Sequence, residues 1–117
     1  MVKRLVLMGE GQGELHSLPN LAARLLAHYG GTDVLFVDQD VMRVKDIHHL
    51  AARDFGNWRR YLAAATKRRD LGGILVVLDG DSDYFPAGSR QSFCAANVAC
   101  QLTQVAESEV TAAERLA

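Results

Sequence analysis

The stretch Ile74-Leu75-Val76-Val77-Leu78, followed at once by Asp79-Gly80-Asp81-Ser82-Asp83, decides the fold class of this 117-residue chain. Five consecutive apolar residues, rich in β-branched types and preceded by Gly72-Gly73, predict a strand buried on both faces, as in a parallel sheet. Three carboxylates then follow at alternate positions. Such a cluster needs a cation or hydrogen bonds to offset its repulsion, and Mg²⁺ takes oxygen ligands of this kind. The alternative is a solvated turn, because Asp, Gly and Ser are also common turn formers.

Two other short apolar runs predict further buried strands of the same sheet. Leu5–Met8 and Val34–Val37 are continuous rather than alternating, which is typical of strands covered on both faces. Between them, apolar residues at helical spacing predict a helix with Ser17 as its N-cap, ended by Gly30-Gly31. These elements give the order strand, helix, strand.

The rest of the chain continues this alternation. Residues 41–45 are expected to be a loop, and Asp46 is the expected N-cap of a helix that Gly56-Asn57 breaks or kinks. A last apolar stripe from Cys94 to Val105 predicts a helix after the acidic segment. The order β-α-β-α-β-α predicts a single α/β domain over residues 1–117, with a parallel sheet and helices on both faces.

This fold is a small three-layer, Rossmann-like architecture with three predicted strands. A sheet of this class is expected to have a fourth strand, which is not found in the sequence. We therefore expect the chain to be a fragment of a longer protein or to complete its sheet with another chain as a homo-oligomer.

Composition limits the function classes. The net charge is −1, so nucleic-acid binding would require a local basic patch. The candidates are Arg59, Arg60, Lys67, Arg68 and Arg69, whose alternative role is a solvated helix face. The chain has no segment typical of a membrane span or a signal peptide, so a cytoplasmic location without membrane contact is expected.

The acidic residues are expected to gather at one end of the sheet. In an open α/β sheet, ligands bind at the carboxyl ends of the strands, and the common order 2-1-3 makes the first and third strands neighbours. Glu10 would then face the cluster of Asp79, Asp81 and Asp83. The turn from Gly9 to Glu14 lacks the residues of a phosphate-binding glycine loop. Glu14 is either a further metal ligand or a first-turn acid favoured by the helix dipole.

These residues resemble a known family. A strand followed by Glu10-Gly11, then a helix, and later a strand followed by Asp79-x-Asp81, looks like the Toprim domain shared by topoisomerases, primases and overcoming-lysogenization-defect (OLD) nucleases. The form Glu10-Gly11-Gln12-Gly13-Glu14, with Leu18-Pro19 at the helix, is most similar to the nuclease branch and to small stand-alone Toprim-like proteins. The resemblance covers residues 4–105. The fourth strand and the further acidic or lysine residues of that branch are not matched.

The resemblance implies a Mg²⁺- or Mn²⁺-dependent nuclease. Glu10 would be the catalytic acid/base or a metal ligand, and Asp79 and Asp81 would be the metal ligands. Glu14 would join the metal site, and Asp83 would assist it. The reaction would be metal-assisted hydrolysis of a nucleic-acid phosphodiester. One alternative is a non-catalytic metal- or nucleic-acid-binding module that works with a partner such as an ATPase. Another is a receiver-like domain in which Asp79 accepts a phosphoryl group.

Overall fold

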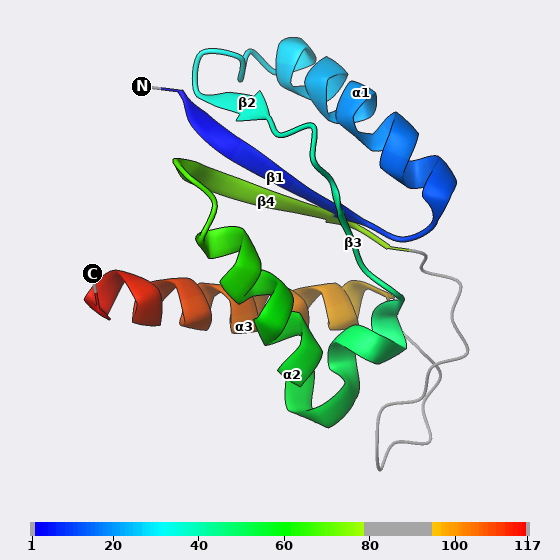
Figure 1. Ribbon diagram of the computed structural model, residues 1–117, viewed down its shortest axis with the longest axis vertical. Helices are drawn as coiled ribbons and strands as arrows, with labels where there is room; N and C mark the ends of the chain where they lie inside the picture. The colour runs from blue at the N-terminus through cyan, green and yellow to red at the C-terminus, as the bar shows by residue number, and fades with distance from the viewer. Residues whose placement is uncertain (1, 79–94, 117) are drawn as a thin grey trace. The chain divides into compact units, whose positions relative to one another are not determined.

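The computed structural model describes residues 2–78 and 95–116, and within them the chain has an α/β fold (Figure 1). The elements in order are β1 Lys3–Gly9, α1 Gln12–His28, β2 Leu35–Val37, β3 Met42–Arg43, α2 Ile47–Thr66, β4 Leu71–Val77 and α3 Ala95–Leu116. The chain forms two compact units. Unit 1 contains Met1–Lys45 and Ala64–Leu78, and unit 2 contains Asp46–Ala63 together with α3.

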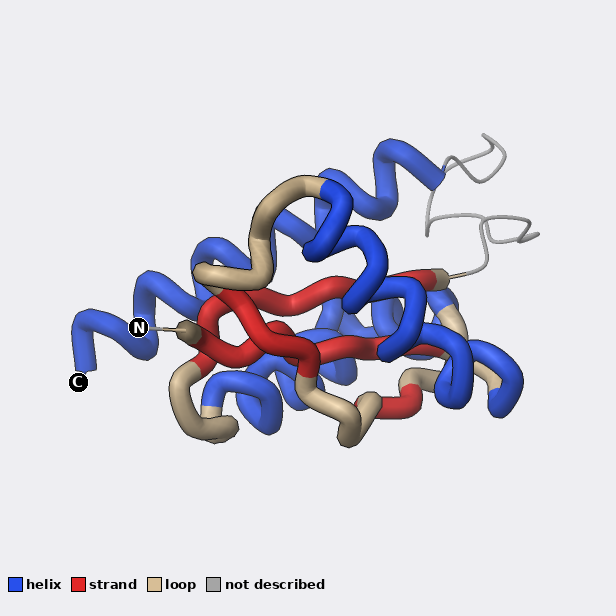
Figure 2. The backbone as a smooth tube through the Cα atoms, turned by 90° about the horizontal axis from the view of Figure 1, so that it is seen from above, coloured by secondary structure: helices blue, strands red, loops and turns tan. Residues whose placement is uncertain are grey.

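Unit 1 is built around a parallel sheet with β1 at its centre. β4 pairs with β1 along the length from Arg4 to Gly9. Because a strand has two hydrogen-bonding edges, β2 and β3 lie along the opposite edge of β1, one after the other. Figure 2 shows the strands running side by side. This arrangement confirms the predicted parallel sheet and the predicted adjacency of the first strand and the third predicted strand, which is β4.

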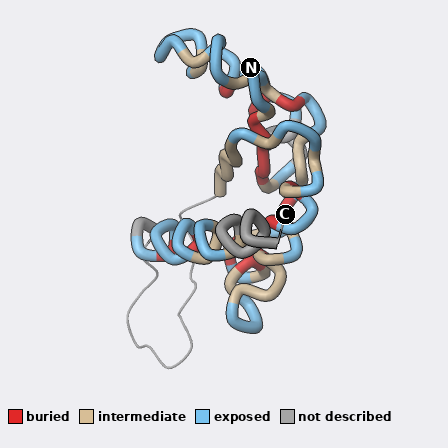
Figure 3. Tube along the Cα trace, turned by 90° about the vertical axis from the view of Figure 1, so that its left-hand side faces the viewer, coloured by how far each residue is buried: buried red, intermediate tan, exposed pale blue. Residues whose placement is uncertain are grey.

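Helix α1 packs against one face of this sheet and forms the core of unit 1. Leu5, Leu7, Leu18 and Ala22 are its buried members. The stretch Leu5–Gly9 of β1 is the longest buried run among the described residues (Figure 3). The predicted end of the helix is confirmed. The N–H of Gly31 donates to the carbonyl of Leu26 at 2.7 Å, and Gly30 has a φ of 70°, as expected of a glycine that closes a helix.

The predicted start of this helix is wrong. α1 begins at Gln12 rather than after Ser17, so Pro19 lies inside the helix instead of in its first turn. Gly11 is the N-cap residue and has a φ of 79°, a value that glycine adopts without strain. This turn brings the chain from the end of β1 into the helix within two residues.

Three further expectations about unit 1 are corrected. β4 begins at Leu71, so Gly72-Gly73 lie inside the strand, and its residues 74–78 are half-buried rather than buried on both faces. β4 pairs only with β1 among the described strands, which leaves it at an edge. β2 is also an edge strand, with Phe36 exposed, and residues 41–45 contain β3 instead of being loop throughout.

Unit 2 joins two helices through the side chain of Trp58. Asp46 caps α2 as predicted, because its carboxylate accepts the N–H of His49 at 2.8 Å. The break in α2 falls at Ala52–Phe55, just before the predicted position, and three of those residues have left-handed backbone angles. The indole N–H of Trp58 donates to the carbonyl of Leu102 in α3 at 2.9 Å. Both residues are buried.

Candidate functional site

The carboxyl ends of β1 and β4 lie side by side. Gly9, the last residue of β1, is the register partner of Val77, the last residue of β4. On the other side of β1, the N–H of Val44 donates to the carbonyl of Gly9 at 3.0 Å, so the end of β1 is held from both edges. The residues that follow Gly9 and Val77 in the sequence therefore leave the sheet from neighbouring points.

Glu10 follows Gly9 directly and is half-buried. The tight turn at Gly11 places it between the end of β1 and the start of α1, where the first backbone N–H groups of a helix have no intrahelical partner. Glu14 belongs to the first turn of α1, as one of its two predicted roles requires, but its side chain lies outside the described part of the structure. The site thus has one described carboxylate.

The other predicted ligands, Asp79, Asp81 and Asp83, lie outside the described residues. Among the described residues, no group of three or more His, Cys, Asp or Glu side chains is arranged to hold a metal ion. Carboxylate oxygens are the ligands that Mg²⁺ and Mn²⁺ prefer, so the residue types of the predicted set fit the ion. The metal site remains a prediction from the sequence.

The predicted basic residues fall into two groups. Arg59 and Arg60 belong to α2 in unit 2, where Nε of Arg59 lies 3.2 Å from a carboxylate oxygen of Glu109 and Arg60 is exposed. In unit 1, Lys67 and Arg69 are exposed in the turn before β4. Arg68 is different, because its guanidinium group forms ion pairs with acids of the same unit, which offset its charge.

Those ion pairs form a cluster that was not predicted from the sequence. Oδ2 of Asp38 lies 2.9 Å from Nη1 of Arg4 and 2.9 Å from Nη1 of Arg68. Oδ1 of Asp38 accepts the N–H of Asp40 at 2.9 Å, and the carbonyl of Asp40 accepts a further bond from Arg68. Arg4 also stacks over the ring of Phe36. The one signal in the sequence was an aspartate directly after the strand Val34–Val37.

The cluster keeps Asp38 ionised. Burial alone would raise the pKa of its carboxyl group. The backbone N–H of Asp40 and the guanidinium groups of Arg4 and Arg68 outweigh that effect and lower the pKa below its ordinary value. We regard the cluster as structural, since it joins β1, the end of β2 and the turn before β4.

Comparisons with known proteins leave the family open. No protein-family model, no curated protein and no solved structure matches the chain. None of the helices in the described part of the chain is long and apolar enough to cross a membrane.

Proposed function

We propose that this protein is a divalent-metal-dependent phosphodiesterase that acts on nucleic acid, with a Toprim-like acidic centre. Glu10 is the catalytic acid/base or a metal ligand. Asp79 and Asp81 are the main ligands, and Glu14 and Asp83 complete the set. A divalent ion bound there would lower the pKa of a bound water molecule and stabilise charge on the phosphate.

The observation that carries the proposal is the register of Gly9 with Val77. Glu10 is one residue beyond Gly9, and Asp79 is two residues beyond Val77. Consecutive Cα atoms are about 3.8 Å apart, and paired strands are separated by about 4.8 Å. Chain connectivity therefore limits the distance between the Cα atoms of Glu10 and Asp79 to at most about 16 Å. This limit supports a shared site for two acids that are more than 60 residues apart in the sequence.

The first experiment is a calorimetric titration with Mn²⁺ and with Mg²⁺. Wild type should bind saturably, and Asp79→Asn/Asp81→Asn should not bind, because it lacks two carboxylates of the set. The matched control is Asp33→Asn/Asp70→Asn, which makes the same change of charge at two exposed acids of unit 1 and should bind like wild type. Equal binding by all three proteins, or none by wild type, would contradict the metal site.

The second experiment tests hydrolysis directly. Glu10→Gln should abolish Mg²⁺-dependent cleavage of nucleic acid while its thermal unfolding stays close to that of wild type. Full cleavage by this variant would remove Glu10 from the site. The cleavage assay and the titration are independent, so binding without turnover would favour the non-catalytic module.

The basic turn before β4 provides a test of substrate contact. Lys67→Gln/Arg69→Gln removes two exposed cations, whereas Arg68 is left in its ion pairs. Each lost phosphate contact should lower the slope of log affinity against log salt by roughly 0.7 to 0.9, so the expected decrease is about 1.5. Arg24→Gln, at an exposed cation of α1, is the control and should leave the slope unchanged.

A further inference from the structure

One edge of β4 has backbone groups for which the described strands supply no partner. In the register of β1 with β4, Val6 pairs with Ile74 and Met8 pairs with Val76. The odd-numbered residues of β1 form hydrogen bonds on the side of β2: the N–H of Lys3 donates to the carbonyl of Val34, and the carbonyl of Leu5 accepts the N–H of Asp38. The backbone groups of the even-numbered residues therefore face β4. In a parallel ladder, the N–H and C=O groups of Ile74 and Val76 then point away from β1.

The two edges of this sheet differ in how they are protected. Strands β2 and β3 are only three and two residues long, and the charged cluster of Asp38 follows β2. β4 is seven residues long and contains neither a charged residue nor proline. Natural proteins usually shorten an edge strand or place charge or proline on it, since an unprotected edge can pair with another strand. The edge of β4 lacks these protections.

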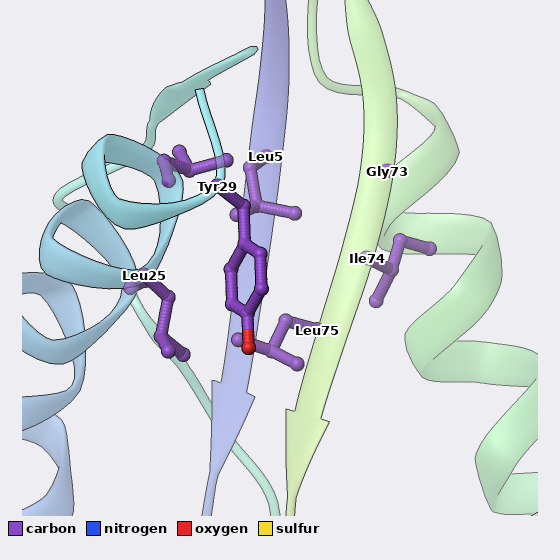
Figure 4. A pocket seen from close by; sticks show the side chains of 8 residues that line it. Leu5, Leu25, Tyr29, Gly73, Ile74 and Leu75 are labelled. Atoms are coloured by element: carbon purple, nitrogen blue, oxygen red, sulfur yellow. The ribbon is translucent and has the colours of Figure 1, made fainter. Parts of the chain in front are cut away.

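An apolar hollow of about 300 Å³ lies beside this edge on the α1 face of the sheet. It exists because Gly73 places no side chain there, between Leu5, Leu75 and the last turns of α1. Figure 4 shows the ring of Tyr29 lying along β1 between Leu25 and Leu75, with Gly73 on the neighbouring strand. Tyr29 is 79% exposed, so the rim of the hollow is an apolar surface in contact with solvent.

We propose that two copies of this chain associate through β4, paired antiparallel about a twofold axis at Ile74. Ile74 is the middle residue of Leu71–Val77, and its outward N–H and C=O groups would pair with those of the second copy. Leu75 of the second copy then lies opposite Gly73, in a pair whose Cα atoms are about 4.5 Å apart and whose side chains share a face. That leucine would fill the hollow.

The occupant is a second copy because the surface is self-complementary. The same strand supplies the hollow at Gly73 and the leucine two residues later, and an isologous contact needs both on one surface. Every cross-strand pair within β4 is apolar or contains glycine, so no like charges meet. The association is independent of the proposed metal chemistry.

The geometry also places the two α1 helices on the same face of the joined sheet. A twofold axis perpendicular to the sheet keeps both helices on one face, and α1 packs over β1 and β2. The helix axes would be about four strand spacings apart, roughly 19 Å, so the helices would not pack at the usual 8–10 Å and only long side chains would reach across the space between them. Tyr29 and Leu25 line the hollow on the side of α1 that faces this space.

The size of the contact predicts a weak dimer. Seven residues of strand are about 24 Å long, and a strand layer with a helix layer is roughly 20 Å deep, so the pair would bury at most about 1,000 Å² in total. This area is at the lower limit of specific interfaces, and we therefore expect dissociation constants in the micromolar range.

Sedimentation velocity at concentrations from about 5 to about 500 µM covers that range of affinity. Wild type should pass from monomer to dimer. Tyr29→Lys should weaken association at least tenfold by placing a charge in the contact, and Gly73→Ala should weaken it by filling the hollow. The added methyl group would lie 3.4 Å from Cδ1 of Leu5, so only a small shift is needed and the fold should be retained. Val34→Lys, at an exposed valine next to the opposite edge, is the matched control and should dimerise normally.

Hydrogen exchange locates the contact. The amides of Ile74 and Val76 should exchange more slowly as concentration rises, whereas those of Leu75 and Val77, which face β1, should not change. A wild type that stays monomeric would overturn the proposal. A dimer whose Ile74 and Val76 amides are insensitive to concentration, or one that Val34→Lys disrupts as strongly as Tyr29→Lys, would also overturn it.

Discussion

The substitution Asp38→Asn tests whether the buried ion cluster stabilises unit 1. It keeps the shape of the side chain and an oxygen that can accept the N–H of Asp40, but it removes the negative charge shared by Arg4 and Arg68. Oδ2 lies 2.9 Å from a nitrogen of each guanidinium group. The side chain of Asp38 is only 9% exposed, while those of Arg4 and Arg68 are 27% and 23% exposed. The acid is thus largely desolvated and its partners are partly hydrated.

These geometries set the size of the effect. A hydrogen bond to a charged group contributes about 1.5 to 3 kcal/mol when it is buried. Two such bonds are lost, but the partly hydrated arginines recover some solvation and the neutral amide costs less to bury. We expect the free energy of unfolding to fall by about 2 kcal/mol, equivalent to a decrease in Tm of roughly 6 to 12 °C.

Urea denaturation at pH 7 measures this change, with Asp40→Asn as the matched control. The side chain of Asp40 is 87% exposed, and its carboxylate lies 3.5 Å from Nη2 of Arg68. An exposed pair of this kind should contribute no more than about 0.5 kcal/mol. If Asp38→Asn changes the free energy of unfolding no more than Asp40→Asn does, the cluster is not a stabilising element.

The pH dependence gives a second check on the same residue. The pKa of Asp38 is lowered in the folded protein, so its contribution to stability is fully present above the unfolded-state pKa, near 3.9. That contribution is lost as pH falls through the lower folded-state pKa. The difference in stability between wild type and Asp38→Asn should therefore be constant near neutral pH and shrink in acid. A difference that grows in acid would contradict the assigned direction.

Three further substitutions test local features of the fold by urea denaturation. Trp58→Phe should cost about 1 to 2 kcal/mol, because it removes the indole bond and leaves the buried carbonyl of Leu102 unpaired. Asp46→Ala should cost about 1 kcal/mol, because the N–H of His49 loses its cap, and Asp46→Asn should restore most of this stability. Gly30→Ala should cost about 1 kcal/mol, because alanine is strained at a φ of 70°.

Strands β1 and β4 were predictable because their sequences contain continuous apolar runs. Leu5–Met8 lies within β1, and Ile74–Leu78 covers the end of β4 and the residue that follows it. The predicted adjacency of these two strands is confirmed. The extent of burial was less predictable. A run of apolar residues does not distinguish a central strand from an edge strand, and β4 is half-buried because only one of its edges pairs with a described strand.

Two boundaries were missed for local reasons. α1 begins five residues before Ser17 because Gly11 takes a φ that turns the chain immediately after β1, and a prediction based on polar caps ignores such a glycine. β3 is only two residues long and has no periodicity of its own. It pairs with the end of β1, through Met8 with Met42 and Gly9 with Arg43.

The Asp38 cluster was missed because its members are far apart in the sequence. Arg4 and Arg68 are 64 positions apart, and each meets Asp38 only after the parallel sheet has formed. From the sequence alone, Arg68 was grouped with Lys67 and Arg69 as a contact for nucleic acid. The structure distinguishes it from its neighbours, since it is the one of the three with a described carboxylate partner.

The sheet of unit 1 has regions suited to different tasks. The carboxyl ends of β1 and β4 lie side by side, with Glu10 directly after β1, at the end of the sheet where ligands of α/β proteins bind. The unprotected edge of β4 uses Ile74, Val76 and the hollow at Gly73, none of which is a carboxylate. Metal binding and self-association should therefore be separable: Glu10→Gln should still dimerise, and Gly73→Ala should still bind Mn²⁺. If either substitution abolished both metal binding and dimerisation, the metal site and the dimer contact would have to share one surface.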